Sequence, residues 1–281
     1  MEIYTTISEI KEFIKSKKLV GEKIGFVPTM GYLHQGHLSL MKEARQDNDI
    51  VIASIFVNPT QFGPDEDYDE YPRDLDRDAE LAAEVGVDAV FAPEADEIYD
   101  SGAATTIQVE GLTDKLCGAC RPGHFTGVCI IVSKLFNIIA PDHAYFGQKD
   151  AQQVLVIKRM VKDLNFDLEI VIVPIVREED GLAISSRNKY LNQEERTAAT
   201  VLYNSLELAR ELIEQGENKA KVVENKMVEM IKEEPLAKID YVEVVKQETL
   251  ESVTKIKDKI LIALAVYIGG TRLIDNVMLE V

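Results

Sequence analysis

Short apolar runs alternate with amphipathic stretches from residue 24 to about residue 175. Residues 49–57 form a near-continuous apolar run, which is typical of a parallel strand covered on both faces. Shorter runs predict further strands at residues 24–28, 89–91, 105–109, 143–146 and 168–173. Apolar positions at helical spacing predict helices at residues 36–47, 73–85, 125–139 and 151–164. Strands separated by helices predict βαβ units, a parallel sheet and right-handed crossovers.

The pattern changes after about Val176. We therefore expect an α/β domain over residues 1–175 and a smaller C-terminal α+β domain over residues 176–281. The predicted elements of the second domain are one long amphipathic helix at residues 193–214, a helix at residues 219–233, and strands at residues 241–245 and 260–267.

Composition and charge argue against several classes of protein. Hydrophobic residues make up 46% and charged residues 28% of the chain, an ordinary globular balance. No apolar run approaches the roughly 18 residues that span a bilayer. The N-terminus lacks the basic and apolar regions of a secretion signal, so we expect a cytoplasmic protein. A net charge of −18 disfavours nucleic acid as a partner, because phosphate backbones attract basic surfaces.

Three cysteines raise the question of zinc or redox chemistry. Cys117 and Cys120 form a CxxC pair, whereas Cys129 has no second pair near it. A structural zinc site needs four ligands at set spacing, and a redox CxxC usually opens a helix after a strand. We interpret all three as reduced, partly buried thiols, and a role for the CxxC pair stays open.

Two of the four histidines, His34 and His37, lie in the turn after the first predicted strand. In open α/β sheets, ligands bind at the carboxyl ends of the strands. Gly31 and Gly36 allow a tight turn there, and a helix that begins near Gly36 directs N–H groups at an anion. The two imidazoles suit the donation of hydrogen bonds to phosphoryl oxygens as charge develops.

Other interpretations of this histidine pair carry less weight. A histidine in a turn also serves as a cap or a packing residue, and two histidines three apart also occur as metal ligands. Here no carboxylate or cysteine beside them completes a coordination set. The turn also lacks the GxxxxGK[ST] and GxGxxG patterns of other phosphate-binding loops.

A second strand-to-helix turn spans residues 147–153. Lys149 is a candidate phosphate ligand, because its ammonium group is a flexible point charge. Asp150 either caps the helix or accepts hydrogen bonds from ribose hydroxyls. Gln153 lies one turn further on, and its amide both donates and accepts.

Residues 181–188 connect the two expected domains. Ser185 and Ser186 supply hydroxyl donors and Arg187 supplies a permanent cation, a set that suits a triphosphate. An interdomain connection also suits a mobile lid. The alternative is a polar linker with a serine cap. We expect these three segments to meet over one nucleotide at the edge of the sheet.

HxGH after the first strand and a small-Ser-Ser-Arg loop after the last resemble the paired signatures of the HIGH nucleotidyltransferase superfamily. Further segments narrow the resemblance to the pantothenate synthetase family, the pantoate–β-alanine ligases, and the six ordered motifs cover nearly the whole chain. They are Pro28-Thr29-Met30-Gly31-x-Leu33-His34-x-Gly36-His37, Phe56-Val57-Asn58-Pro59-x-Gln61-Phe62, Tyr71-Pro72-Arg73, Arg121-Pro122-x-His124-Phe125, Gly147-Gln148-Lys149-Asp150-x-Gln152-Gln153 and Ser185-Ser186-Arg187-Asn188.

The resemblance implies a Rossmann-like catalytic domain that binds ATP and pantoate. It also implies a C-terminal lid domain whose loop is related to the KMSKS loop of class I aminoacyl-tRNA synthetases. The implied reaction joins (R)-pantoate to β-alanine through a pantoyl-adenylate and gives pantothenate, AMP and pyrophosphate for coenzyme A biosynthesis. The family further implies a homodimer and the use of Mg²⁺ with ATP.

The resemblance also assigns residues. His37 is implied as the proton donor, with His34, Lys149 and Arg187 as the other catalytic residues. Gln61 is implied to contact pantoate and β-alanine, and Gln153 to contact pantoate. The neutral amides of Asn58 and Gln61, at the end of the second strand, would orient the hydroxyl and carboxylate groups of a small acid. The implied ATP site comprises Met30, Gly31, Tyr32, Leu33, His34, Gln35, Gly36, His37, Gly147, Gln148, Lys149, Asp150, Val176, Ile184, Ser185, Ser186 and Arg187.

Two points depart from the family pattern or leave it incomplete. Ile184 stands where the family often has methionine, an apolar change of similar volume. Asp74, Asp76 and Asp78 follow the tyrosine–proline–arginine motif, but a charge run on a helix is usually a solvated face. The magnesium ligands therefore stay unassigned, in keeping with the reliance of Mg²⁺ on waters and substrate phosphates.

Three other hypotheses compete with a ligase. One is a related nucleotidyltransferase that adenylates a phosphorylated metabolite and stops, although the Asn-Pro-x-Gln segment argues against it. Another is a truncated tRNA synthetase, for which the acidic chain offers no evident tRNA-binding extension. The third is a non-catalytic nucleotide-binding protein, against which His34, His37, Lys149 and Arg187 speak.

Overall fold

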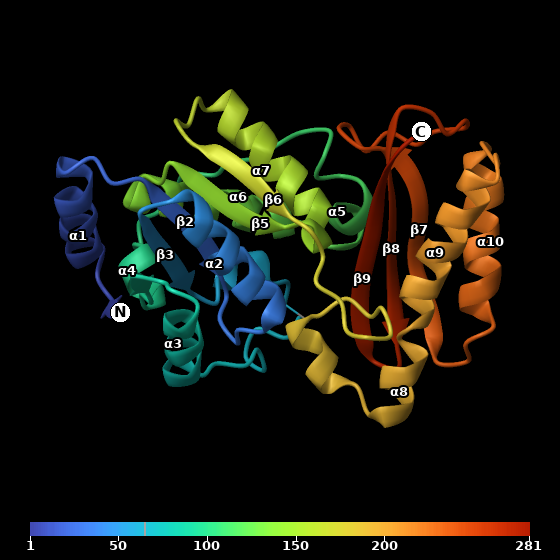
Figure 1. Ribbon diagram of the computed structural model, residues 1–281, viewed down its shortest axis with the longest axis horizontal. Helices are drawn as coiled ribbons and strands as arrows, with labels where there is room; N and C mark the ends of the chain where they lie inside the picture. The colour runs from blue at the N-terminus through green and yellow to red at the C-terminus, as the bar shows by residue number, and fades with distance from the viewer. Residues whose placement is uncertain (65) are drawn as a thin grey trace. The chain divides into compact units, whose positions relative to one another are not determined.

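Six parallel strands form the sheet that contains the N-terminal strand (Figure 1). The structure is a computed structural model and describes residues 1–64 and 66–281. The strand order is β1-β4-β3-β2-β5-β6, and the expected parallel-sheet fold is confirmed. The strands are β1 Glu2–Tyr4, β2 Ile24–Thr29, β3 Ile50–Ile55, β4 Ala89–Phe91, β5 His143–Gly147 and β6 Glu169–Val173.

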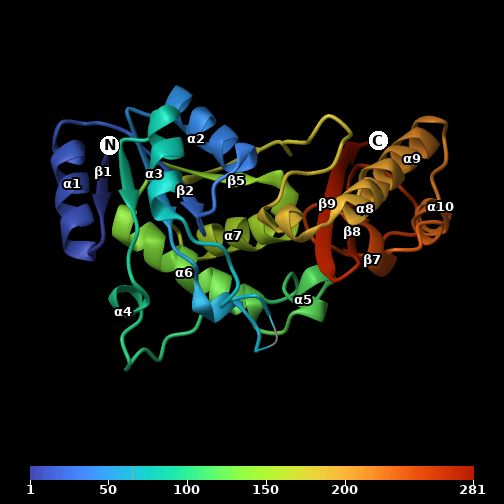
Figure 2. The ribbon, with the colours of Figure 1, turned by 90° about the horizontal axis from the view of Figure 1, so that it is seen from below.

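Helices cover both faces of this sheet. Figure 2 shows α2 and α3 on one face and α6 and α7 on the other, as right-handed crossovers require. Because both faces are covered, β2 and β3 are almost entirely buried, and Phe26 and Ile52 are fully enclosed. The helices are α1 Ile7–Leu19, α2 Gln35–Asp47, α3 Leu75–Glu84, α4 Ala95–Ile98, α6 His124–Ile139 and α7 Ala151–Asp163.

The order of the strands reverses at β2. From β2 the chain proceeds to β3 and β4 on one side, whereas β5 and β6 lie on its other side. In open α/β sheets such a reversal opens a crevice beyond the carboxyl ends of the strands, and ligands bind there. The turns that follow β2 and β3 therefore begin at the ligand-binding edge of the sheet.

The chain divides into two compact units. The first comprises Met1–Asp114, Gly118–Gly147 and Gln152–Pro174, and the second comprises Lys115–Cys117, Gln148–Ala151 and Ile175–Val281. Four residues of the second predicted turn, Gln148–Ala151, thus belong to the second unit although the residues on either side belong to the first.

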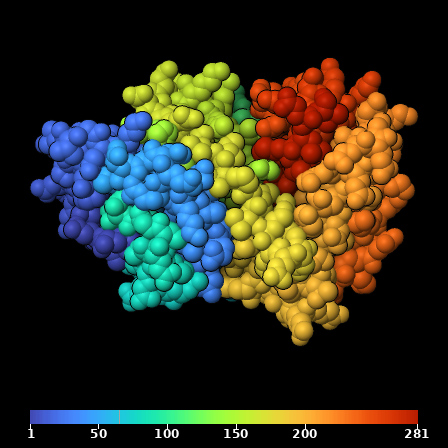
Figure 3. All heavy atoms as spheres, in the orientation of Figure 1, coloured from blue at the N-terminus to red at the C-terminus, as the bar shows by residue number. Residues whose placement is uncertain are grey.

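An antiparallel sheet in the order β7-β8-β9 is the centre of the second unit. The middle strand β8 is buried along almost its whole length, and α9 and α10 pack against the sheet through stripes that include Leu206 and Met227. The atoms of these helices (orange) lie directly against those of the strands (red) in Figure 3. The elements are η2 Gln148–Asp150, η3 Ser186–Tyr190, α8 Gln193–Ala198, α9 Val201–Glu214, α10 Ala220–Lys232, β7 Ala237–Lys246, β8 Lys259–Ile268 and β9 Thr271–Glu280. Helix α5 Leu116–Cys120 begins among the residues of this unit and ends among those of the first.

Two predicted elements were wrong. Residues 105–109 form no strand; they are mostly exposed and belong to neither of the two sheets. The single helix predicted at residues 193–214 is two helices, α8 and α9. At the break, Thr200 N–H donates to Thr197 O at 3.3 Å and its hydroxyl donates to the same oxygen at 2.8 Å. A threonine hydroxyl that bonds the preceding turn competes with helical hydrogen bonding, which explains the interruption.

The elements that were not predicted include β1, α1 and β9. Helix α1 buries only Ile10 and Ile14 deeply, so its apolar stripe is narrow. Its available signal was the capping box, in which Thr6 and Glu9 satisfy each other's main-chain N–H groups. Strand β9 carries Asp275 and Asn276 among its apolar residues, and these polar positions obscure the strand pattern.

None of the helices in the described part of the chain is both long enough and apolar enough to cross a bilayer.

Candidate active site

The histidine turn joins β2 to the 13-residue helix α2. His34 precedes the helix in an extended conformation, and His37 lies in the first helical turn. The two imidazole rings stack with their centroids 3.9 Å apart and 23° between their planes. His34 N–H also donates to His37 Nδ1 at 3.4 Å. The structure therefore brings both predicted histidines together at the positive end of a helix, where an anion is favoured.

A buried carboxylate on α3 holds this turn in place. Asp78 has no exposed surface, and it accepts hydrogen bonds from Tyr32 N–H at 2.5 Å and Leu33 N–H at 2.7 Å. Arg77 completes the arrangement: Nη1 donates to Asp78 at 3.3 Å and Nη2 donates to Leu33 O at 3.0 Å. Burial raises the pKa of Asp78 above its ordinary value, although the two N–H groups and the charge of Arg77 favour the ionised form.

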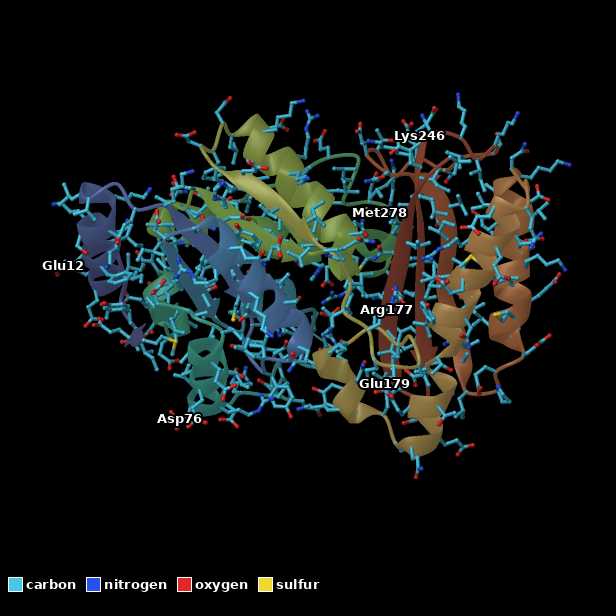
Figure 4. The ribbon with its side chains drawn as sticks, viewed as in Figure 1. Glu12, Asp76, Arg177, Glu179, Lys246 and Met278 are labelled. Atoms are coloured by element: carbon cyan, nitrogen blue, oxygen red, sulfur yellow. The ribbon has the colours of Figure 1, made fainter. Side chains whose placement is uncertain are left out.

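The expectation of a solvated aspartate face was therefore wrong for Asp78. Helical periodicity explains the difference, because positions two apart do not share a helix face, so Asp78 faces the β2 turn while Asp76 faces solvent. Asp74 accepts from Arg77 N–H as the N-terminal cap of α3, and Asp76 is exposed in the first turn of that helix (Figure 4). Of these three aspartates, Asp78 is the one that accepts hydrogen bonds from the backbone of the predicted ATP-binding turn.

Gly31 is required by the close packing of the same turn. Its φ angle is +82°, a conformation that residues with a side chain rarely adopt. A Cβ atom there would lie 2.9 Å from Ile55 Cγ2 and 3.0 Å from Asp78 Oδ2. The turn thus has β3 on one side and the Asp78 carboxylate on the other.

The turn after β3 contacts the turn after β2. Asn58 is 1% exposed, and its Nδ2 donates to Gly127 O at 3.3 Å and to Gln61 Oε1 at 3.1 Å. Gln61, at the end of η1 Pro59–Gln61, donates from Nε2 to Met30 Sδ at 3.0 Å. The structure thus brings Met30, Asn58 and Gln61 together. Within this group, the hydrogen bonds of the buried Asn58 side chain hold the turn in place, whereas the Gln61 side chain is half-buried beside Met30.

Helix α6 is the platform beneath Gln61. A Cβ atom at Gly127 would lie 2.2 Å from Thr60 O, so only glycine lets the η1 backbone approach the helix this closely. At the start of α6, His124 Nδ1 donates to Gln61 O at 2.8 Å. These contacts fix the backbone of Gln61 and leave its side chain to be set by Asn58 and Met30.

An ion pair flanks the Gln61 turn. Arg121 donates to both carboxylate oxygens of Glu66, from Nε at 2.6 Å and from Nη2 at 2.5 Å. Burial pushes the pKa of Glu66 upward, but the hydrogen bonds and the charge of Arg121 outweigh burial and hold that pKa below its ordinary value. Sequence reasoning used Arg121 and His124 only as marks of resemblance, and it missed Glu66, whose partner lies 55 positions away.

We expect the stability that Glu66 provides to disappear in acid. A carboxylate whose pKa is lower in the folded than in the unfolded chain stabilises the fold above the unfolded value and loses that effect as the pH falls through the folded value. The free energy of unfolding of the Glu66→Gln variant should therefore lie below that of the unmodified protein at about pH 7. The difference between the two free energies of unfolding should disappear below pH 4.5, the ordinary pKa of a glutamate side chain. Urea unfolding at a series of pH values measures the gap, and a gap that does not change with pH would contradict the assignment.

In the second unit, residues 176–184 form a tight hairpin. Ile184 N–H donates to Val176 O at 3.0 Å, and Glu178 N–H donates to Leu182 O at 2.9 Å. Arg177 and Ala183 pair as an antiparallel bridge between them. The structure therefore places Val176 and Ile184, two of the predicted ATP-binding residues, side by side.

The serine–arginine segment follows directly from this hairpin. Ser185 caps η3, because its hydroxyl accepts from Arg187 N–H at 3.3 Å. Asn188 ties the segment back to the hairpin by donating from Nδ2 to Ala183 O at 3.1 Å. Ser185, Ser186 and Arg187 are half-buried. The serine cap weighed in the sequence analysis is thus present, in a segment that also gathers two hydroxyls and a cation.

Lys149 lies in η2 Gln148–Asp150 and belongs to the same unit as the serine–arginine segment. Its side chain is 21% exposed, and Nζ lies 4.0 Å from Asp150 Oδ1. Strand β9 contacts both η2 and η3, so the two predicted phosphate-binding segments share one supporting strand. In the first unit, Gly147 ends β5, and Gln153 is half-buried in the first turns of α7.

Within residues 1–64 and 66–281, no group of three or more His, Cys, Asp or Glu side chains is placed to hold a metal ion. Cys117 is half-buried and Cys120 exposed on α5, and Cys129 is buried on α6. Burial raises the pKa of Cys129 to about 11, so its thiol stays protonated near neutral pH.

The parallel sheet, its reversal at β2 and the stacked histidines at a strand-to-helix turn define an α/β enzyme of the nucleotidyltransferase type. The family model described as pantoate-beta-alanine ligase matches residues 2–278. The chain therefore belongs to the pantoate–β-alanine ligase family.

Relatives and solved structures agree with this membership. The chain is 59% identical to the pantothenate synthetase of Moorella thermoacetica, over 100% of this chain and 99% of that protein. It is also 59% identical to the pantothenate synthetase of Acetivibrio thermocellus, over 100% of both chains. A crystal structure of pantothenate synthetase from Thermus thermophilus superposes with a TM-score of 0.94 at 47% identity, covering 99% of each chain. A pantoate-beta-alanine ligase from Francisella tularensis, complexed with beta-gamma ATP and beta-alanine, gives a TM-score of 0.80 at 37% identity, covering 99% of this chain and 97% of that one.

Proposed function

We propose that the protein condenses (R)-pantoate with β-alanine, using ATP, to give pantothenate, AMP and pyrophosphate. The observation that carries this proposal is the contact between the turns after β2 and β3, where Gln61 Nε2 donates to Met30 Sδ at 3.0 Å. One turn carries two histidines suited to phosphate oxygens, and the other carries neutral amides suited to a small hydroxy acid. Family membership and the substrates bound to the Francisella relative support the same reaction.

The chemistry follows two steps. First, a carboxylate oxygen of pantoate attacks the α-phosphorus of ATP, and the bond to pyrophosphate breaks. The amine of β-alanine then attacks the acyl carbon of the pantoyl-adenylate, AMP leaves, and the nitrogen loses a proton. Neither step needs a covalent bond to the protein, so the side chains contribute by positioning the reactants and by stabilising developing charge.

The proposed roles are those that the resemblance to the ligase family implies. His37 acts as the proton donor, with His34, Lys149 and Arg187 donating hydrogen bonds to phosphate oxygens. Gln61 contacts pantoate and β-alanine, Gln153 contacts pantoate, and Asn58 orients Gln61, to which it donates. The ATP site comprises Met30, Gly31, Tyr32, Leu33, His34, Gln35, Gly36, His37, Gly147, Gln148, Lys149, Asp150, Val176, Ile184, Ser185, Ser186 and Arg187.

Magnesium enters this scheme with ATP. Mg²⁺ commonly keeps several waters and binds through substrate phosphates, so the nucleotide phosphates and water would hold the ion. The ion would offset the negative charge of the phosphates during adenylation. No side chain is assigned as its ligand.

The remaining assignments come from the family. We propose a cytoplasmic homodimer, because the family is dimeric and its ATP and small-acid substrates are cytoplasmic metabolites. We also propose that residues 1–175 form the catalytic domain and residues 176–281 the lid domain. Lys115–Cys117 and Gln148–Ala151 are exceptions, since they group with the second unit.

The expected result is AMP formation that depends on both small substrates. With ATP and pantoate alone, the protein should release pyrophosphate and retain the adenylate. Addition of β-alanine should then give continuous formation of AMP and pantothenate. Coupled assays of pyrophosphate and AMP, with and without each substrate, measure this dependence. Pyrophosphate release that β-alanine does not accelerate would point to a nucleotidyltransferase that stops at the adenylate, and ATP binding without pyrophosphate release would point to a non-catalytic protein.

A further inference from the structure

Two polar side chains are buried in the last strand of the second unit. Asp275 is 2% exposed and Asn276 is 3% exposed, and their partners on β8 are the apolar residues Leu264 and Ala263. Burial of a carboxylate or an amide in such surroundings costs free energy unless each polar atom is hydrogen-bonded. Their hydrogen bonds therefore indicate what these residues are for.

Asn276 is bonded to the Lys149 segment. Its Nδ2 donates to Gln148 O and to Lys149 O, both at 3.0 Å, and its Oδ1 accepts from Gln148 Nε2 at 3.3 Å. The two carbonyl oxygens belong to the peptide groups immediately before and after the Lys149 Cα atom. One buried amide therefore fixes the backbone from which the Lys149 side chain extends.

Asp275 is bonded to the hairpin that precedes the serine–arginine segment. Its carboxylate accepts from Arg177 Nη1 at 2.6 Å and from Arg177 Nη2 at 2.9 Å, a bidentate ion pair. Arg177 Nη1 also donates to Gly181 O at 3.0 Å, and the guanidinium lies 4.8 Å from the centre of the Tyr203 ring. Figure 4 shows Arg177 between the hairpin and β9. Arg177 is adjacent to Val176 and thus ties the hairpin to the strand.

The two sets of contacts are joined to each other. Asn276 N–H donates to Asp275 Oδ1 at 2.7 Å, so neighbouring residues of one strand serve both segments. Burial raises the pKa of Asp275 above its ordinary value, although Arg177 and the N–H of Asn276 favour the carboxylate. A network of this kind sets the positions of Lys149 and of the segment that contains Arg187 relative to one strand, β9.

We propose that Asn276 and Asp275 are positioning residues that hold Lys149 and the Val176–Arg187 segment in the geometry needed for adenylation. This inference rests on the proposed function, in which both segments bind the phosphates of ATP. Several other donors would still bind ATP in the ground state, whereas the transition state depends on the placement of each charge. Loss of either positioning residue should therefore lower kcat and leave KM nearly unchanged.

The first test is a double-mutant cycle between Asn276 and Lys149, with pyrophosphate release during continuous turnover of ATP, pantoate and β-alanine as the measured rate. Asn276→Ala should lower kcat ~10–100-fold, because a misplacement of about 1 Å costs up to about 10²-fold. In the Lys149→Ala background the same change should cost less than ~3-fold, because the group that it positions is already absent. Equal losses in both backgrounds would overturn the proposal for Asn276.

Val277→Ala is the matched control for the stability of the strand. Val277 is 9% exposed and packs in the apolar core of the second unit. Its truncation should lower the thermal unfolding temperature but leave kcat within ~3-fold at temperatures where the protein is folded. A rate loss for Val277→Ala equal to that for Asn276→Ala would mean that general destabilisation of β9 explains both.

The second test keeps the strand stable. Replacement of a buried ion pair by apolar residues of similar size is often neutral or stabilising, so the double variant Arg177→Met/Asp275→Leu should fold. We expect it to keep its unfolding temperature and to lose ~10-fold or more in kcat, because the hairpin is no longer tied to β9. Unchanged kcat in this folded variant would overturn the proposal for Asp275.

Assays of the unmodified protein distinguish failure of the proposed function from failure of the positioning role. If the unmodified protein fails to form pantothenate, the proposed function fails. If it forms pantothenate but the double-mutant cycle shows no coupling between Asn276 and Lys149, only the positioning role fails.

Discussion

Replacement of either His37 or Lys149 by alanine should lower the rate of adenylate formation by ~10²–10³, because each substitution removes one of the donors proposed to stabilise the developing charge. His37 lies in the first turn of α2 with its ring stacked on that of His34, and Lys149 extends from a segment fixed by Asn276. Since both positions are half-buried, neither truncation removes a large part of the apolar core. Pyrophosphate release with ATP and pantoate, measured under single-turnover conditions, reports the effect.

Two exposed lysines provide matched controls for these variants. Lys42 lies on α2 beyond His37, and Lys158 lies on α7 beyond Lys149. Lys42→Ala and Lys158→Ala should leave adenylate formation unchanged, because surface substitutions usually change stability by less than ~0.5 kcal/mol. Circular dichroism should show the same fold in all four proteins. Near-normal pyrophosphate release by His37→Ala and Lys149→Ala would refute the roles of both residues.

The second large effect is expected for Asp78→Ala, although this residue lies behind the turn that is proposed to bind ATP. The substitution leaves the buried N–H groups of Tyr32 and Leu33 without their acceptor, and each unsatisfied group costs ~1–3 kcal/mol. The histidine turn should shift as a result, and a shift of about 1 Å should slow adenylation by up to ~10²-fold. Urea unfolding measures the first effect and pyrophosphate release measures the second.

Asp76→Ala is the matched control, because Asp76 is an exposed aspartate on the same helix. It should change the free energy of unfolding by less than ~0.5 kcal/mol. Asp78→Asn keeps one acceptor oxygen and should lie between the two alanine variants in both measurements. A folded Asp78→Ala protein with unchanged adenylation would show that the turn keeps its geometry without the carboxylate.

The sequence was sufficient for the parts of the fold and site that depend on local pattern. The strand–turn–helix context of His34 and His37 appears within about twenty residues, and the apolar run at residues 49–57 contains β3. The hairpin beside Ser185 is also local, although its bonding pattern was not predicted. Resemblance, rather than periodicity, supplied the roles of Gln61 and Gln153.

The contacts that hold these segments lie far apart in sequence and could not be predicted in the same way. Asp78 bonds Leu33 across 45 positions, and Asn276 bonds Lys149 across 127. From the sequence alone, an aspartate on a helix or an asparagine in a strand can be either exposed to solvent or buried against a hydrogen-bonding partner. Burial decides the matter, because a polar atom removed from water must find a partner within the fold. The strand predicted at residues 105–109 shows the converse, since alternation without a neighbouring strand gives no sheet.

The grouping of Gln148–Ala151 with the C-terminal unit bears on how this enzyme can be recombined with its relatives. A chimaera joined at residue 175 would take the Lys149 backbone from one parent and the amide that fixes it from the other. Exchange of residues 148–151 together with everything after residue 174 would keep that pairing within one parent. In this chain the unit that contains Lys149 is thus discontinuous in sequence, and crossover points chosen from the linear chain alone would separate Lys149 from Asn276, which holds its backbone.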